Sequence, residues 1–121
     1  MRQTAKLLST TISVAALLGS LAIPAISYAD EATIKEGKEI AFDRKKGNCL
    51  ACHKIADGTL AGTIGPELVG MKDRYPDKAQ LRAQIYDPRT NNPVSIMPPF
   101  GKHEVLTSSE LDKVVDFIHS L

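Results

Sequence analysis

The sequence predicts an all-α fold, and three observations lead to that prediction. Three segments repeat apolar residues at helical spacing, and two of them begin with a capping pattern. The segments between them, residues 54–70 and 91–101, are rich in glycine and proline and are therefore expected to be loops. No segment alternates apolar and polar residues as a half-buried strand does. A chain of 121 residues also suits a single small domain.

The first predicted helix covers residues 33–46. Thr33 is placed to cap it, because Glu36 follows three positions later and completes a capping box. Gly37 lowers helix propensity, so we expect a close helix crossing at that position. Gly47 ends the segment. One face of this helix is formed by Ile34, Gly37, Ile40 and Ala41.

Two further helices are predicted nearer the C-terminus. Residues 77–86 place Leu81 and Ile85 on one face, and Pro88 stops the helix. The last helix begins at Thr107, which caps it together with Glu110. Its apolar stripe consists of Leu111, Val114, Val115 and Ile118.

Residues 1–29 carry the pattern of a secretory signal peptide. Two basic residues open the segment, residues 7–23 are mostly apolar, and the small residues Ser27 and Ala29 match a cleavage site. We expect cleavage after Ala29, which leaves residues 30–121 as the mature domain. An uncleaved membrane anchor is the alternative, but serines and threonines interrupt the apolar run that a membrane span requires.

Removal of the signal peptide leaves about 92 residues with a nearly balanced charge. The 15 basic residues become 13, against 14 acidic ones. This balance argues against nucleic acid as a partner. We also expect no membrane span after the signal has been cleaved.

The only two cysteines of the chain, Cys49 and Cys52, stand directly before His53. Cys-x-x-Cys-His is the attachment signature of a c-type haem. Positions i and i+3 of one helical turn share a face, so both sulfurs can form thioethers with one porphyrin. The imidazole of His53 then binds the iron. The sequence predicts one covalent haem c that supplies much of the apolar interior, and an apoprotein that is largely unfolded.

A Cys-x-x-Cys pair has two other common uses. A thioredoxin-type redox pair is expected within a βαβ pattern, and none is visible around these cysteines. A structural zinc site needs four ligands, and no second Cys or His pair stands at the required spacing. Haem attachment is therefore the favoured prediction.

Met97 is the predicted second axial ligand of the iron. Two prolines follow it and stiffen a loop that can hold its thioether sulfur. Its alternative role is to fill a gap in the packing. His103 is the rival ligand, whereas Met71 is expected in the core and His119 in solvent. With His53 and Met97 bound, the iron has no open position, so we expect electron transfer without a catalytic residue.

Gly65 and Pro66 have a predicted role beside His53. A ligating histidine needs a hydrogen bond at its other ring nitrogen, which fixes the tautomer and the ring angle. The carbonyl oxygen of Pro66, after a tight glycine turn, can accept that bond. The alternative is a plain turn.

Several motifs together resemble SoxX, the monohaem cytochrome subunit of the SoxAX complex of bacterial sulfur oxidation. The haem motif alone is common to all c-type cytochromes. The asparagine before Cys49, the stretch of residues 71–77 and the double proline after Met97 point to SoxX. The resemblance implies a class I cytochrome c fold, with three main helices and loops wrapped around one covalently bound haem. The matching segments are residues 47–53, 62–68, 81–85 and 97–101.

The resemblance also implies a function and partners. A SoxAX-type complex oxidatively joins thiosulfate to a cysteine thiol of a SoxYZ-type carrier protein in the periplasm, as an L-cysteine S-thiosulfotransferase. The catalytic haem of that complex belongs to the SoxA-type subunit, which would form a heterodimer with this chain. This chain would then relay electrons to a downstream cytochrome.

A free periplasmic electron shuttle would have the same fold and haem site and is the alternative function. A cytochrome sensor, whose Met97 dissociates readily, is a third and weaker one. A permanent subunit needs an apolar patch near the haem edge. Candidates for this patch, which otherwise line the haem pocket, are Ile64, Leu68, Ile96, Pro99 and Phe100.

Overall fold

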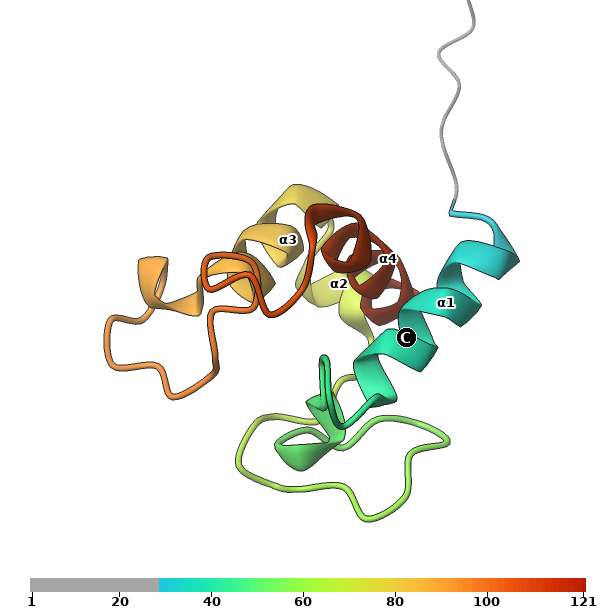
Figure 1. The fold of residues 1–121 in the computed structure, drawn as a ribbon, viewed down its shortest axis with the longest axis horizontal. Coiled ribbons are helices and arrows are strands. Elements are labelled where there is room, and N and C mark those ends of the chain that lie inside the picture. The colour runs from blue at the N-terminus through green and yellow to red at the C-terminus, as the bar shows by residue number, and fades with distance from the viewer. Residues whose placement is uncertain (1–28) are drawn as a thin grey trace, which may run out of the picture.

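In the computed structural model, the described residues 29–121 form four α-helices and two short 3-10 helices. Within this part of the chain the one β-bridge is an isolated parallel pair between Ile55 and Leu68. The predicted all-α fold is therefore confirmed (Figure 1). The predicted signal peptide lies outside the described residues except for Ala29. The elements are α1 (Glu31–Phe42), η1 (Cys49–Ala51), α2 (Met71–Arg74), α3 (Lys78–Tyr86), η2 (Pro88–Thr90) and α4 (Ser108–His119).

Helix α1 begins earlier and ends earlier than predicted. Its N-cap is Asp30, whose carboxylate accepts the Thr33 backbone N–H at 2.6 Å, so the predicted cap at Thr33 is wrong. A carboxylate also complements the positive end of the helix dipole. The helix ends at Phe42, not Lys46, because the side chain of Asp43 accepts the Lys45 backbone N–H and offers the chain a competing turn.

Helices α3 and α4 follow the prediction closely. Asp77 caps α3 through the Ala79 backbone N–H, and the helix ends at Tyr86, two residues before Pro88. At the start of α4, Thr107 and Glu110 form the predicted capping box. The sequence did not predict α2 or η2, because single turns of three or four residues are too short to show helical periodicity.

Helices α1 and α4 cross in close contact, and Gly37 makes this possible. A Cβ atom at position 37 would lie only 2.0 Å from the backbone carbonyl oxygen of Lys113 on α4. The close crossing predicted from Gly37 is thus confirmed. Near the C-terminal end of α1, Phe42 meets Phe117 edge to face, with ring centroids 5.9 Å apart.

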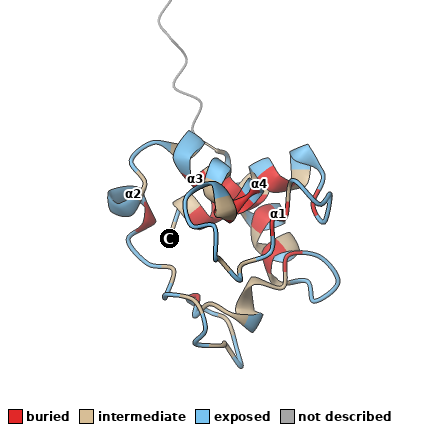
Figure 2. Cartoon of the chain, turned by 90° about the vertical axis from the view of Figure 1, so that its left-hand side faces the viewer, coloured by how far each residue is buried: buried red, intermediate tan, exposed pale blue. Residues whose placement is uncertain are grey.

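The core lies around α4, which packs between α1 and α3, and many of the buried residues gather on these helices in Figure 2. Helix α4 contributes the central side chains, because it packs against both α1 and α3. Helix α2 is tied to the C-terminus, since the Met71 backbone N–H donates to the carbonyl of Leu121 at 2.9 Å. Among the described residues, no helix has the length and apolar character needed to cross a membrane.

Candidate haem-binding site

The cysteine motif folds into a single tight turn. The backbone N–H groups of Cys52 and His53 both donate to the carbonyl of Cys49, at 3.2 and 2.9 Å. This places the motif on one helical turn, as the prediction requires. The neighbouring loop holds the turn in place, because the N–H of Gly62 donates to Leu50 and that of Gly65 donates to Cys52, each at 2.8 Å.

The ring of His53 is held on two sides. Its Nδ1–H donates to the carbonyl oxygen of Pro66 at 2.7 Å, which leaves Nε2 as the nitrogen available to a metal. Gly65 lies directly against the ring, since a Cβ atom there would come within 2.4 Å of the His53 Cε1. The structure therefore contains the hydrogen bond that was predicted for Pro66, together with a steric reason for Gly65.

The Cys49 thiol is poorly suited to dithiol redox chemistry. Burial raises the pKa of the Cys49 thiol to about 11, so this sulfur stays protonated at neutral pH. Redox-active cysteines of the thioredoxin type instead have a lowered pKa. Among the described residues, no group of three or more His, Cys, Asp and Glu side chains is arranged to hold a metal ion.

One cavity brings the predicted site residues together. Its volume of about 700 Å³ lies within the range of about 300–1,000 Å³ that is usual for cofactor sites. The turn that carries Cys49, Cys52 and His53 (the haem turn) and the loop that carries Met97 (the Met97 loop) both line it. These segments are more than 40 residues apart in the sequence. The predicted residues on its wall are Cys49, Cys52, His53, Pro66 and Met97.

The remaining wall is mostly apolar and is continuous with the protein core. Seven of the twelve buried apolar residues also line the cavity. A porphyrin has two large apolar faces, so this wall suits it. The donor set suits it as well, because two thiols, an oriented imidazole and a thioether are the groups that attach and ligate haem c. The seven shared residues are Met71, Leu81, Ile85, Phe100, Leu106, Val114 and Ile118.

Four basic side chains on the cavity wall were missed in the sequence interpretation. Arg44, Lys45, Lys46 and Arg74 line the cavity, and no acidic residue lines it. The guanidinium of Arg74 is oriented by the carbonyl of Glu67, to which it donates at 3.0 Å. A wall with only basic charges favours a ligand that carries carboxylates, as haem does. The run of three basic residues just before the cysteine motif was the available signal.

The other candidate iron ligands differ in where they lie. Met71 is buried in the core, as predicted, and its sulfur accepts a hydrogen bond from the Arg74 guanidinium at 3.2 Å, although it also lines the cavity. His103 is exposed and does not line the cavity. The prediction that His119 lies in solvent is wrong, because it is partly buried and its ring nitrogen Nε2 bonds to the carbonyl of Tyr75 at 3.1 Å.

The predicted apolar patch is only partly present. Ile64 and Ile96 are 67% and 80% exposed and stand on the cavity wall. Leu68 is half-buried and lines the cavity. Pro99 and Phe100 are buried, so of the two roles left open for them the surface patch is excluded. Phe100 lines the cavity instead, because packing against the core removes more apolar surface from water.

Comparisons with known proteins show what this chain is similar to. The solved structure of SoxXA from P. pantotrophus matches with a TM-score of 0.64 and 28% identity, over 71% of this chain and 79% of that one. The match confirms the predicted resemblance to SoxX and the class I cytochrome c fold. An uncharacterized lipoprotein from Aquifex aeolicus is 40% identical over 76 residues, which is 62% of this chain but only 37% of that protein.

A family comparison covers nearly all of the described domain. Residues 32–118 match the family described as Cytochrome C oxidase, cbb3-type, subunit III. This range contains the haem turn, the Met97 loop and all four α-helices, except for the first residue of α1, Glu31, and the last residue of α4, His119. The chain therefore belongs to this family of c-type cytochrome domains.

Proposed function

We propose that the chain is a monohaem electron-transfer subunit of a SoxAX-type complex. The observation that carries this proposal is the shared cavity, where an oriented imidazole and a thioether reach one apolar space. The similarity to the SoxXA structure supports the subunit role. The signal pattern in residues 1–29 supports a periplasmic location, where haem attachment takes place.

Each site residue has a distinct role in this proposal. Cys49 and Cys52 would hold one haem c through two thioether bonds. His53 would bind the iron through Nε2, because the carbonyl of Pro66 fixes its ring and increases its basicity. Met97 would be the second ligand, and a thioether raises the reduction potential relative to a second histidine. Bound in this way, haem c supplies one-electron oxidation and reduction.

The chain's own residues favour electron relay over catalysis. In this proposal His53 and Met97 would both ligate the iron, and both cysteines would be used in attachment, so no free thiol would remain to act as a nucleophile. The joining of thiosulfate to a carrier cysteine releases two electrons, and we assign that step to a SoxA-type partner acting on a SoxYZ-type carrier. This chain would pass the electrons to a downstream cytochrome.

Purification from the native periplasm tests the proposal. An affinity-tagged chain should retain a haem-containing partner. The amount retained should be the same at low and at high salt, because a stable interface depends on buried apolar area. Changing Ile64 and Ile96 to Glu should release the partner. Leu60→Glu is the matched control, because Leu60 is also exposed but does not line the cavity.

A different result would identify the alternative function. A lone haem polypeptide at both salt concentrations would contradict a permanent subunit and favour the free electron shuttle. A partner that binds only at low salt would favour the shuttle too, because transient encounters depend on attraction between charges, which salt screens.

A further inference from the structure

The loop that carries Met97 is closed at its base by two adjacent residues. Residues 88–101 leave the end of α3 and return to it, and the backbone carbonyl of Tyr86 accepts the N–H groups of Gly101 and Lys102, at 3.2 and 3.1 Å. Gly101 also lies directly against the Tyr86 ring, since a Cβ atom there would lie 2.0 Å from Cδ2. The two ends of the loop therefore meet at Tyr86 and Asp87.

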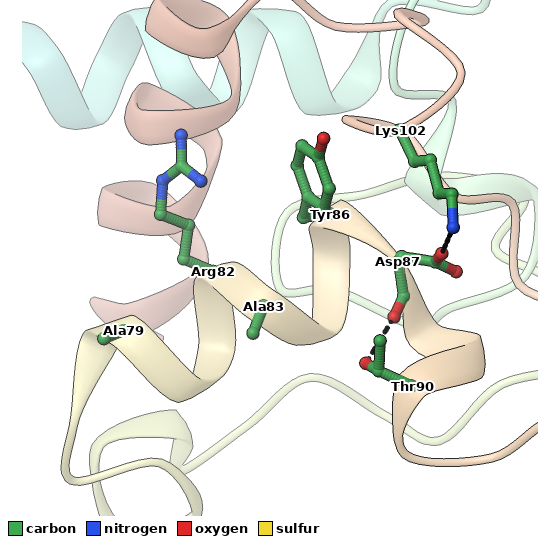
Figure 3. Close-up of a pocket in the computed structure, with 7 residues that line it drawn as sticks. All are labelled: Ala79, Arg82, Ala83, Tyr86, Asp87, Thr90 and Lys102. Carbon is green, nitrogen blue, oxygen red and sulfur yellow. Dashed lines mark hydrogen bonds and ion pairs between the residues drawn. The ribbon is translucent and has the colours of Figure 1, made fainter.

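The carboxylate of Asp87 joins the two ends by charge. It pairs with the ammonium group of Lys102, at the end of the loop, at an N–O distance of 3.0 Å (Figure 3). It also accepts the guanidinium of Arg89, at the start of the loop, at 2.8 and 3.1 Å. Asp87 is only 4% exposed, and Arg89, with Lys102, keeps its pKa far below the usual range. Asp87 is thus a buried anion that is bonded to both ends of the loop.

The middle of the loop has few other anchors. The backbone N–H groups of Val94, Ser95 and Met97 donate only to Asn92 and Ser95 within the loop itself. Val94 and Ile96 are largely exposed. The position of Met97 therefore depends on where the ends of the loop are held and on the buried residues that follow it.

We propose that Asp87 is a positioning residue that holds the Met97 loop closed over the iron. The proposal rests on the proposed role of Met97 as an iron ligand. When the bond to Lys102 is lost, the loop opens more often and the sulfur leaves the iron more often. An external ligand then gains access to the vacated position.

Variants at the base of the loop test this proposal. Arg89 and Lys102 are 39% and 57% exposed, so both remain hydrated if Asp87 loses its charge. Asp87→Asn keeps the shape and removes the charge, whereas Lys102→Gln cuts only the bond to the end of the loop. Lys102→Arg keeps that bond. Asp112→Asn is the matched control, because it breaks the Arg82–Asp112 pair between α3 and α4, away from the loop.

The experiment measures cyanide binding to the ferric haem protein and the absorption band that arises from sulfur-to-iron charge transfer. Asp87→Asn and Lys102→Gln should bind cyanide at least about tenfold faster and weaken the band, since a hydrogen bond to a charged group is lost. Lys102→Arg and Asp112→Asn should match the wild type. The thermal unfolding midpoint of all four variants shows whether a general loss of stability accounts for any change.

Met97→Ala separates failure of this proposal from failure of the proposed function. If Met97→Ala keeps the wild-type band and slow cyanide binding, Met97 is not the ligand and both proposals fall. If Met97→Ala binds cyanide quickly while Asp87→Asn and Lys102→Gln behave like Asp112→Asn, only the positioning role of Asp87 is overturned. Should Asp87→Asn fail to fold, Lys102→Gln alone decides, because it retains the Asp87–Arg89 pair.

Discussion

At the scale of single residues, the surroundings of His53 explain why a glycine and a proline follow it at positions 65 and 66. The proline contributes only a carbonyl, which accepts the Nδ1–H, and the glycine lets the backbone lie against the ring. Neither role needs a side chain that reacts. Both restrict the imidazole to one orientation before any metal is bound, and this lowers the entropy that is lost when the ligand binds.

Gly65→Ala tests this arrangement. The added methyl group would lie 2.4 Å from the ring of His53, so the ring or the loop must move and the bond to Pro66 must lengthen. We expect a loss of about 1–3 kcal/mol in the free energy of unfolding of the haem protein. Thermal or denaturant unfolding measures this loss. Thr63→Ala, an exposed change in the same loop, should have little effect, and equal stability of the two variants would contradict the steric argument.

At the scale of elements, the first turn of α4 connects the haem turn to the helical core. The carboxylate of Glu110 accepts the backbone N–H of Thr107 at 3.0 Å and also pairs with the ammonium group of Lys46. Lys46 lies three residues before Cys49 and lines the cavity. One carboxylate therefore caps a helix and ties down the segment that leads into the haem turn.

The pH dependence of stability should reveal this carboxylate. Lys46 and the capped N–H of Thr107 lower the pKa of Glu110 to about 2, below the usual value of about 4.3. The contribution of Glu110 to the free energy of unfolding is therefore complete at pH values above its usual pKa and is lost as the pH falls toward 2. Compared with Glu110→Gln, the wild type should be about 1 kcal/mol more stable at pH 7, and this difference should shrink by pH 3.

Denaturant unfolding from pH 7 to pH 3 measures the difference. Glu39→Gln is the control, because Glu39 is exposed on α1 and forms no ion pair within the described residues. A difference between the wild type and Glu110→Gln that stays constant over this range would contradict the assigned role.

The helices differ in how well the sequence predicts them, and the reason is physical. Helix α4 carries its complete capping box and apolar stripe within its own residues, so local information suffices. Helix α1 offers both Asp30 and Thr33 as caps, and the geometry of the folded chain decides between them. Helix α2 follows Gly70 in the left-handed region and is held by Leu121, fifty residues away, which no local pattern shows.

At the scale of the whole molecule, the site is easier to predict than the fold around it. The attachment motif is short and chemically specific, so Cys49, Cys52 and His53 follow from spacing alone. Which loop returns to the same cavity, and which apolar residues face it, depends on packing between distant segments. The burial of Phe100 and the ion pair of Asp87 with Lys102 belong to this second kind of information.

The same packing determines how the chain should behave without its cofactor. More than half of the buried apolar residues face a cavity of about 700 Å³, and exposed residues such as Ile64 and Ile96 show that it reaches the surface. A closed, empty cavity of this size would cost about 17 kcal/mol, at about 24 cal/mol per Å³. Even a third of that cost would remove much of the roughly 5–15 kcal/mol that stabilises a small domain.

Cys49→Ser combined with Cys52→Ser should therefore abolish covalent haem and leave a chain with little helix. Circular dichroism and the absence of a cooperative thermal transition measure this loss, and acid–acetone extraction shows whether any haem remains attached. Ala51→Ser, an exposed change between the two cysteines, is the matched control and should keep both the haem and the helices. A double serine variant that unfolds cooperatively, with native helix content and no haem, would show that α1, α3 and α4 hold the fold by themselves. The apolar cavity wall would then need another explanation, because its seven core residues would be stable beside empty or hydrated space.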